Sequence, residues 1–353
     1  MRKTTKIAVI GAGFAGAATS YFLHEAGLRD HVIFEAEDMP GTRASGLNAA
    51  MGRQVISDPE FRKMAIDGVQ FLRNPPAGFS EVPLIDHRGS VLCFSPSDHS
   101  TAEALFKSAQ HDGIACELWD AEKLHTTYPL MRDVDCAIAT ATDGIIDIHS
   151  LLYAYLKPAR AAQQLHTSTH ITKLVQKNNH WEIHTTQGAW DAEIIVNAAG
   201  AWASHIAQLA NTETVPLQVR RRHLFVTALT SRVPSDWPFI WDLSHNYYFR
   251  PESGSVMISV CDEDITTADD AFESSDAVYQ LMEQKLSTFC PTLTDLPIAH
   301  RWAGARTFTE DSRPLVRWDA QAKNVLWVAG LGGHGATTSS SIGRIAAQKL
   351  STI

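Results

Sequence analysis

Three glycines near the start of the chain have the spacing of a phosphate-binding turn. Gly11, Gly13 and Gly16 follow an apolar run at residues 7–10 and open a helical pattern at residues 14–26. The first glycine permits a tight turn, the second lets backbone approach a pyrophosphate, and the third lets the helix pack closely on the strand. The helix start also presents unpaired N–H donors. The pattern predicts a bound dinucleotide; the alternative is a glycine turn with only a structural role.

An acidic residue follows at the distance that this motif requires. Residues 31–34 form a second apolar strand, and Glu35 comes directly after it, 24 positions beyond Gly11. A carboxylate in this place is suited to a hydrogen bond with an adenosine ribose, and it disfavours a 2′-phosphate. NADP is therefore the least suitable dinucleotide, but this unit does not by itself distinguish NAD from FAD.

A second glycine-rich turn lies close to the other end of the chain. It joins a buried strand at residues 325–329 to a helix at about residues 337–350. Its glycines are Gly330, Gly332, Gly333 and Gly335. A second positive helix end suits a flavin ring, whose reduced form carries negative charge, and this favours FAD over NAD. The alternative is a loop that only returns the last helix to the sheet.

The segments between these turns predict two different folds. A third strand at residues 193–197 precedes the small residues that end at Trp202, and a hairpin at residues 170–185 comes before that strand. Other segments alternate as antiparallel strands do, and residues 278–289 present one apolar helical face. These antiparallel segments are residues 223–230, 247–250 and 255–260. We therefore expect a parallel sheet for the dinucleotide and a separate antiparallel unit.

Composition limits the classes of partner. The 353 residues suggest two domains, and a formal net charge of -9 argues against binding to nucleic acid or to anionic lipid. The five cysteines are widely spaced, as in reduced cytosolic proteins: Cys93, Cys116, Cys136, Cys261 and Cys290. Residues 1–18 are basic and then apolar, but glycines interrupt the apolar stretch, so we expect neither a secretory leader nor a transmembrane segment. The expected location is the cytoplasm.

Seven segments together resemble one known family. They are GAGFAG (11–16), RASGLNAA (43–50), NPPAGF (74–79), VNAAGAW (196–202), NYYFRP (246–251), WAGARTF (302–308) and GLGGHG (330–335). The chain resembles the FAD-dependent D-amino-acid oxidase (DAO) superfamily over nearly all of its length. Within that superfamily it most resembles the soluble D-arginine and D-amino-acid dehydrogenases.

The resemblance implies a fold of the α/β plus α+β class. A Rossmann-like FAD-binding domain of the DAO type is expected from residues 1–80, 143–212 and 299–353. A discontinuous substrate-binding domain with an antiparallel sheet is expected from residues 81–142 and 213–298.

The resemblance also implies which residues contact FAD. They are Gly11, Gly13, Phe14, Ala15, Gly16, Glu35, Arg43, Ala44, Ser45, Asn48, Ala49, Ile171, Ala199, Gly200, Trp202, Gly304, Arg306, Gly332, Gly333, His334, Gly335, Ala336 and Thr337. Some relatives attach FAD through a cysteine in the segment that corresponds to residues 305–308. No cysteine lies there in this chain, so we expect non-covalent FAD.

Four residues are candidates for chemistry by the same resemblance. Arg222 and Arg306 are expected to hold a substrate carboxylate, since the planar guanidinium suits that group, and Tyr248 adds a hydrogen bond. His334 lies beside the flavin turn. Each has a structural alternative: Arg222 as part of a solvated run of arginines, Arg306 in an ion pair, Tyr248 in core packing, and His334 bonded to backbone.

The implied activity is oxidation of the CH–NH2 bond of a D-amino acid by hydride transfer to flavin N5. The imine product hydrolyses to a 2-oxo acid and ammonia, and oxygen or a quinone accepts the electrons. The arginine-preferring relatives use a loop glutamate where this chain has Gly89-Ser90, and a lid tyrosine near the position of Ile56. We therefore expect a more apolar pocket mouth and neutral or aliphatic substrates.

Two other substrate classes stay open at this stage. One is glycine, sarcosine or another secondary amine, and the other is a hydroxy acid or polyol phosphate. A non-catalytic flavin-binding role is a further alternative. No metal site is expected, because the histidine pairs His166/His170 and His180/His184 fall on predicted strands or turns without a matching carboxylate or cysteine cluster.

Overall fold

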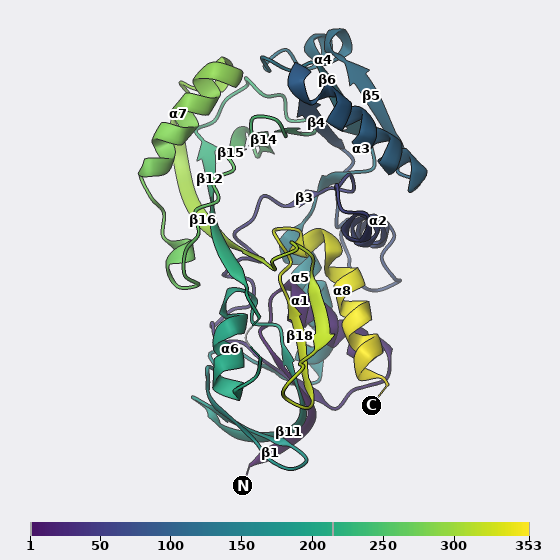
Figure 1. Ribbon diagram of the computed structural model, residues 1–353, viewed down its shortest axis with the longest axis vertical. Coiled ribbons are helices and arrows are strands. Elements are labelled where there is room, and N and C mark those ends of the chain that lie inside the picture. Colours follow the sequence, from purple (N-terminus) through teal and green to yellow (C-terminus); the bar gives the residue numbers. More distant parts are fainter. Residues whose placement is uncertain (1, 214, 353) are drawn as a thin grey trace.

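The computed structural model describes residues 2–213 and 215–352, and these residues form two eight-stranded sheets with flanking helices (Figure 1). One sheet lies in the lower half of the view, near both chain ends, and the other lies in the upper half. A further two-stranded sheet joins β3 (Met51–Gly52) to β7 (Gly144–Ile145).

Parallel strands form the centre of the first sheet. β1 (Lys3–Ile10) pairs in parallel with β2 (His31–Phe34) on one side and with β11 (Gly188–Asn197) on the other. β18 (Val325–Ala329) pairs in parallel with β11. The end of β1 and all of β2 and β18 are buried, which is why these strands are continuously apolar in sequence. The outer strands are β8 (Leu165–His166), β9 (Ile171–Gln176), β10 (Trp181–Thr185) and β17 (Leu315–Trp318).

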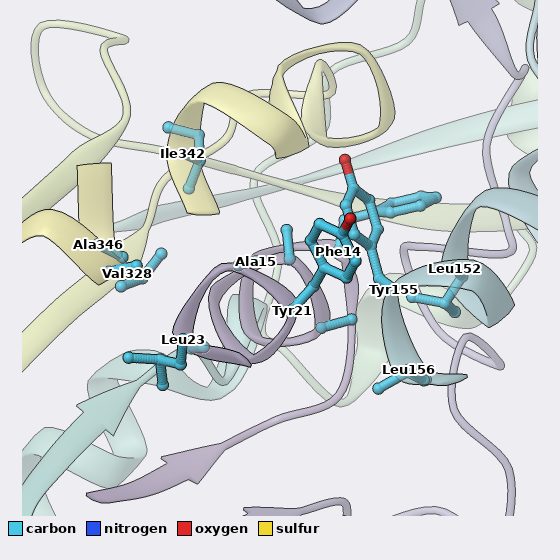
Figure 2. Close-up of a cluster of buried hydrophobic side chains, with 14 of the residues drawn as sticks. Phe14, Ala15, Tyr21, Leu23, Leu152, Tyr155, Leu156, Val328, Ile342 and Ala346 are labelled. Carbon is cyan, nitrogen blue, oxygen red and sulfur yellow. The ribbon is translucent and has the colours of Figure 1, made fainter. Parts of the chain in front are cut away.

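Helix α1 (Phe14–Glu25) is packed between α5 (Ile148–Ala161) and α8 (Gly335–Leu350). Figure 2 shows Tyr21 of α1 beside Tyr155 of α5, with Ile342 of α8 on the other side. The contact with α8 is close at Gly343, where an added Cβ would lie 2.6 Å from the backbone carbon of Ala18. This packing sets the starts of α1 and α8 at the same end of the sheet.

The second sheet is built mainly from antiparallel pairs, in the order β16-β12-β15-β14-β13-β4-β6-β5. Its longest ladder joins β12 (Gln218–Thr227) to β16 (Ile298–Phe308), and these strands extend from the upper sheet toward the lower one (Figure 1). The other strands are β4 (Ser90–Phe94), β5 (Cys116–Asp120), β6 (Cys136–Thr140), β13 (Phe239–Asp242), β14 (Tyr247–Glu252) and β15 (Ser255–Ser259). The remaining helices are α2 (Pro59–Arg73), α3 (His99–His111), α4 (Ala121–Thr127), α6 (Ala203–Ala210) and α7 (Ala277–Phe289), with short 3-10 turns at Pro96–Asp98, Gly200–Trp202, Asp270–Phe272 and Pro291–Leu293.

The elements predicted around the two glycine turns are confirmed, although several bounds differ; the third strand, for example, begins at Gly188 and not at residue 193. The strand expected at residues 223–230 begins earlier, at Gln218, and ends at Thr227, because the chain turns there and Thr230 N–H bonds the carbonyl of Gly254. The last helix begins at Gly335 rather than near residue 337.

The domain boundaries stay a prediction; the predicted segment 299–353 begins inside β16, which pairs with β12 in the second sheet. Within the described residues, no helix combines the length and apolarity that crossing a bilayer needs.

His31 supplies a pH-sensitive contact between β2 and α1. Its Nε2 lies 2.8 Å from Ser20 Oγ and its Nδ1 lies 3.0 Å from the carbonyl oxygen of Leu28. Burial, and then the nearby His24, lower the pKa of His31 to about 4 from its ordinary 6.5. The folded protein therefore resists protonation of this ring more strongly than the unfolded chain does.

We expect the folded protein to lose stability as the pH falls from about 6.5 toward 4. The depressed pKa predicts that His31 accounts for about 2 kcal/mol of the unfolding free energy lost between pH 7.5 and pH 5. Urea denaturation of the holoprotein at these two pH values measures it, with His31→Gln compared with the exposed control His125→Gln. The prediction fails if both variants lose as much stability as the wild type.

Candidate active site

The first glycine turn is a place where side chains do not fit. Gly11 has a φ of 101°, and a Cβ there would lie 2.5 Å from the carbonyl oxygen of Ala198. A Cβ on Gly16 would lie 1.9 Å from the carbonyl oxygen of Gly11, so the start of α1 rests directly on the turn. Gly13 begins the helix and faces Ser45, whose Oγ accepts a hydrogen bond of 3.0 Å from Phe14 N–H. The turn therefore presents backbone groups and one hydroxyl.

Glu35 is fixed beside this turn by backbone groups. One carboxylate oxygen accepts a hydrogen bond from Ala12 N–H at 2.8 Å, and the other accepts one from Glu37 N–H at 3.0 Å. These bonds hold the carboxylate at the carboxyl end of β2. Because each carboxylate oxygen has a further lone pair, Glu35 can still accept a hydrogen bond from a ribose hydroxyl.

The second glycine turn is connected to β16. Gly332 N–H donates to the carbonyl of Thr307 at 2.9 Å, and Gly330, Gly332 and Gly333 all have positive φ values. A Cβ on Gly333 would lie 2.4 Å from Arg306 Nε. Glycine at this position thus leaves room for the arginine side chain.

Two adjoining cavities connect the two turns. The Glu35 cavity is lined by Gly11, Glu35, Arg43, Ile171, Ala199 and Trp202, and the Arg306 cavity is lined by Phe14, Ala15, Asn48, Ala49, Arg222, Tyr248, Gly304, Arg306, Gly332, Gly333, His334, Gly335, Ala336 and Thr337. Gly13, Ala44, Ser45 and Gly200 line both cavities. Every residue expected at the cofactor thus borders one of these spaces except Gly16, which packs α1 on the turn. Their roles toward a ligand stay a prediction.

The donor set of these cavities fits FAD. The positive starts of α1 and α8 border the same continuous space, and such helix ends favour negative charge. Gly11 and Gly13 leave a cradle that side chains would fill, and Glu35 stands beside it as a ribose acceptor. The residues present therefore suit a dinucleotide whose phosphates lie near α1 and whose flavin ring lies near α8.

The ladder of β12 and β16 brings three arginines to one face. Arg222 lies two residues beyond Arg220 on β12, and Arg306 of β16 is the cross-strand partner of Arg220. All three contact Glu263, which lies in the segment after β15. Its Oε1 is 2.9 Å from Arg222 Nη2 and 3.3 Å from Arg306 Nη1, and its Oε2 is 2.7 Å from Arg220 Nη1.

Both candidate clamp arginines are charged at neutral pH. Burial, and then the charge of Arg222, lower the pKa of Arg306 to about 10. Burial also disfavours the charge on Arg222, but neighbouring groups, Cys261 first, raise its pKa in net. The solvated-face hypothesis does not describe Arg222, whose side chain is buried. Arg306 does form an ion pair, with Glu263, as its structural alternative proposes. It also lines the cavity.

Tyr248 and His334 both enter the Arg306 cavity as neutral groups. Burial raises the pKa of Tyr248, whose ring also packs against Trp241 at a centroid distance of 5.0 Å. Burial, followed by the charges of Arg53 and Arg306, holds the pKa of His334 well below its usual 6.5. The ring of His334 contacts Phe61 edge to face at 4.9 Å. Tyr248 is therefore a hydrogen-bond donor at neutral pH, and His334 carries no charge.

Three residues of the cavity region escape sequence reasoning. Arg53 and Trp241 line the Arg306 cavity, and Glu263 bridges its arginines. Arg53 follows the RASGLNAA segment by only three positions, which is the one signal that pointed to it. Glu263 lies in a loop without a recognisable motif, so no signal was available.

Two expectations about the pocket mouth need correction. Ile56 packs with Phe61 and Ala65, and neither cavity is lined by it. Ser90 points to Asp143, whose carboxylate accepts its hydroxyl hydrogen bond at 2.6 Å. These positions therefore shape the neighbouring core and not the mouth of the cavity.

One histidine of the two predicted pairs has carboxylates near it. His180 does lie near two carboxylates, those of Glu182 and Asp191, contrary to the expectation that no such cluster surrounds it. Arg2 pairs with both carboxylates, at 2.5 Å and 3.5 Å, and Lys177 lies 3.6 Å from Glu182. The cluster is thus already balanced by side-chain cations.

Comparison with known proteins places the chain in a family. The family model described as FAD dependent oxidoreductase (DAO) matches residues 6–349. The chain belongs to this family of FAD-dependent oxidoreductases, and FAD is its cofactor. Human mitochondrial dimethylglycine dehydrogenase is 26% identical over 364 residues, which cover 95% of this chain and 41% of that protein. The chain thus spans about two fifths of this relative's length.

Two solved structures share the fold. The L-proline dehydrogenase of P. horikoshii superposes with a TM-score of 0.88 at 19% identity, covering 100% of this chain and 94% of that one. The glycine oxidase of Geobacillus kaustophilus has a TM-score of 0.83 at 18% identity, covering 99% and 95%. The predicted DAO-type fold is confirmed by these likenesses. The predicted resemblance to D-arginine dehydrogenases in particular is not shown by these relatives.

Glu263 competes with any anion for Arg222 and Arg306. Replacing it in Glu263→Gln removes the charge but keeps the length of the side chain, so we expect acetate to bind the holoprotein about tenfold more tightly. Titration followed by the visible spectrum of the flavin measures the affinity. Asp276→Asn, which removes an exposed carboxylate paired with Arg301, is the control. Weaker acetate binding in Glu263→Gln would instead show that Glu263 is needed to orient the arginines.

Proposed function

We propose that the protein oxidises the carbon–nitrogen bond of a small amino acid with FAD as the electron acceptor. The observation that carries this proposal is the pair of charged guanidinium groups of Arg222, which is buried, and Arg306, which is half-buried. Both border the cavity that also receives the glycine turn of α8. A planar cationic pair matches a carboxylate and fixes the orientation of the atoms attached to it.

The side chains of this cavity would position the substrate. Arg222 and Arg306 bind its carboxylate in exchange for Glu263, and the neutral phenol of Tyr248 donates a further hydrogen bond. The positive charge of these arginines disfavours an ammonium group, so the amine is favoured in its neutral form. Bound FAD supplies the acceptor for the two electrons. The oxidised substrate is an imine, which water hydrolyses to a 2-oxo acid and ammonia or an alkylamine.

D-Amino acids and N-alkyl glycines are the two candidate substrate groups. The sequence resemblance favours D-amino acids with neutral or aliphatic side chains. Dimethylglycine dehydrogenase, a relative by sequence, favours N-alkyl glycines. A D-arginine preference receives no support, since Ser90 is turned toward Asp143 and supplies no carboxylate for a cationic tail. Oxygen or a quinone as the final acceptor, and a cytoplasmic location, are parts of the proposal.

Anaerobic reduction of the bound flavin separates these candidates. Loss of absorbance near 450 nm is measured with D-alanine, D-valine, sarcosine and dimethylglycine, and with glycerol 3-phosphate and lactate as hydroxy compounds. We expect bleaching by amines with a free carboxylate, with release of ammonia from the D-amino acids, methylamine from sarcosine and dimethylamine from dimethylglycine. Bleaching by the hydroxy compounds alone would contradict the proposed reaction class.

A variant of Arg306 tests its role in the same assay. Arg306→Met is expected to raise the substrate concentration for half-maximal bleaching at least ~tenfold, because a charge-assisted hydrogen bond to the carboxylate is lost. The control is Arg221→Met, on the same strand as Arg222. Arg221 donates to the carbonyl of Asp270 and lines neither cavity. If both variants need the same substrate concentration for half-maximal bleaching, Arg306 does not bind the substrate.

A further inference from the structure

A third arginine borders the Arg306 cavity. Arg53 follows β3 directly, the residue is 9% exposed, and its guanidinium carbon lies 4.4 Å from the ring centroid of Trp241. Trp241 pairs with Tyr248 across β13 and β14, and all three residues line the cavity. The arginine is thus held against one wall of the same space that receives Arg222 and Arg306.

Arg53 differs from the other buried arginines in its lack of partners. Its Nε is buried without a hydrogen-bond partner in the described part of the chain. Arg62, in contrast, donates to Asp112, Ser108 and the carbonyl of Ile56. Arg250 donates to two carbonyl oxygens and pairs with Glu252. A buried guanidinium is costly unless it is paired, so an unpaired one beside a cavity indicates that an anion from outside the chain completes it.

The carboxylate whose charge acts on Arg53 is that of Asp143, and its hydrogen bonds go to other groups. Asp143 accepts hydrogen bonds from the amide and backbone of Gln54 and from Ser90. Glu263 pairs with the other arginines of the cavity. Burial lowers the pKa of Arg53 to about 10, so the side chain is charged at neutral pH. Arg53 is thus a cation of the cavity that has a carboxylate in its neighbourhood, Asp143, but donates no hydrogen bond to a carboxylate among the described residues.

We propose that Arg53 binds a second acidic group of the substrate, so that the preferred substrates are amino acids or N-alkyl glycines with two carboxylates. This inference rests on the proposed function, in which Arg222 and Arg306 hold the first carboxylate. The indole of Trp241 lies against the guanidinium group, and the part of Arg53 that lines the cavity would donate hydrogen bonds to the second carboxylate. Arg53 would thus select substrates by the charge of the second carboxylate and by its distance from the first.

Binding and reduction by matched pairs of ligands test this assignment on the holoprotein. Malonate and acetate are compared for binding by calorimetry, and iminodiacetate and sarcosine are compared for anaerobic flavin reduction. We expect the wild type to favour the dicarboxylate of each pair at least ~tenfold, and Arg53→Met to lose that preference. Arg53→Lys is expected to restore part of it, since the charge remains but the planar fork is lost. Arg88→Met is the matched control, because Arg88 pairs with Asp86 and lines neither cavity.

The outcomes separate this inference from the proposed function. If the wild type and Arg53→Met show the same preference between the two ligands of each pair, Arg53 does not bind a second acidic group. Release of FAD from Arg53→Met with no change in that preference also overturns the inference, because Arg53 would then contact the cofactor. If malonate binding depends on Arg53 but no amine reduces the flavin, the anion site stands and the proposed amine oxidation fails.

Discussion

The close contact of helix α1 with helix α8 is the constraint on which the site depends. The two helices come from opposite ends of the chain, and each begins in a glycine turn that follows a buried parallel strand. Gly343 permits the helices to approach at Ala18, and Gly16 permits α1 to rest on Gly11. Both helix starts consequently face one continuous space. Two partial positive charges at this spacing favour a ligand that is anionic at one end and becomes anionic at the other.

Charge then determines what lies over this space. The ladder of β12 and β16 carries Arg220, Arg222 and Arg306 on one face, and Glu263 joins them as the counter-charge supplied by the chain. Arg53 adds a further cation from a different element. An anionic substrate with a neutral amine suits such a cavity better than a zwitterion does. The same arrangement would make Glu263 a competitor for the substrate carboxylate that we propose to bind Arg222 and Arg306.

Local patterns in the sequence predict the parts of the fold that backbone sterics decide. The turn at Gly11–Gly16, the acid at Glu35 and the strand before Gly330 follow from glycine conformation and from apolar runs. The segments RASGLNAA and WAGARTF identify the cofactor and clamp residues only through resemblance to a family. Glu263 and Trp241 were not predictable, because their place depends on which strands become neighbours in the second sheet. The contact of Ser90 with Asp143 likewise joins distant segments, whereas Ile56 packs on the nearby residues Phe61 and Ala65 of α2; the expected pocket mouth was therefore misplaced.

We expect the two glycine turns together to hold one FAD without a covalent bond. The direct measurement is to precipitate the purified yellow protein with acid and to quantify flavin in the supernatant and in the pellet. The expected result is about one FAD per chain, all of it in the supernatant, since residues 305–308 contain no cysteine. Purified protein that is colourless and does not take up added FAD, or flavin that stays in the pellet, would contradict it.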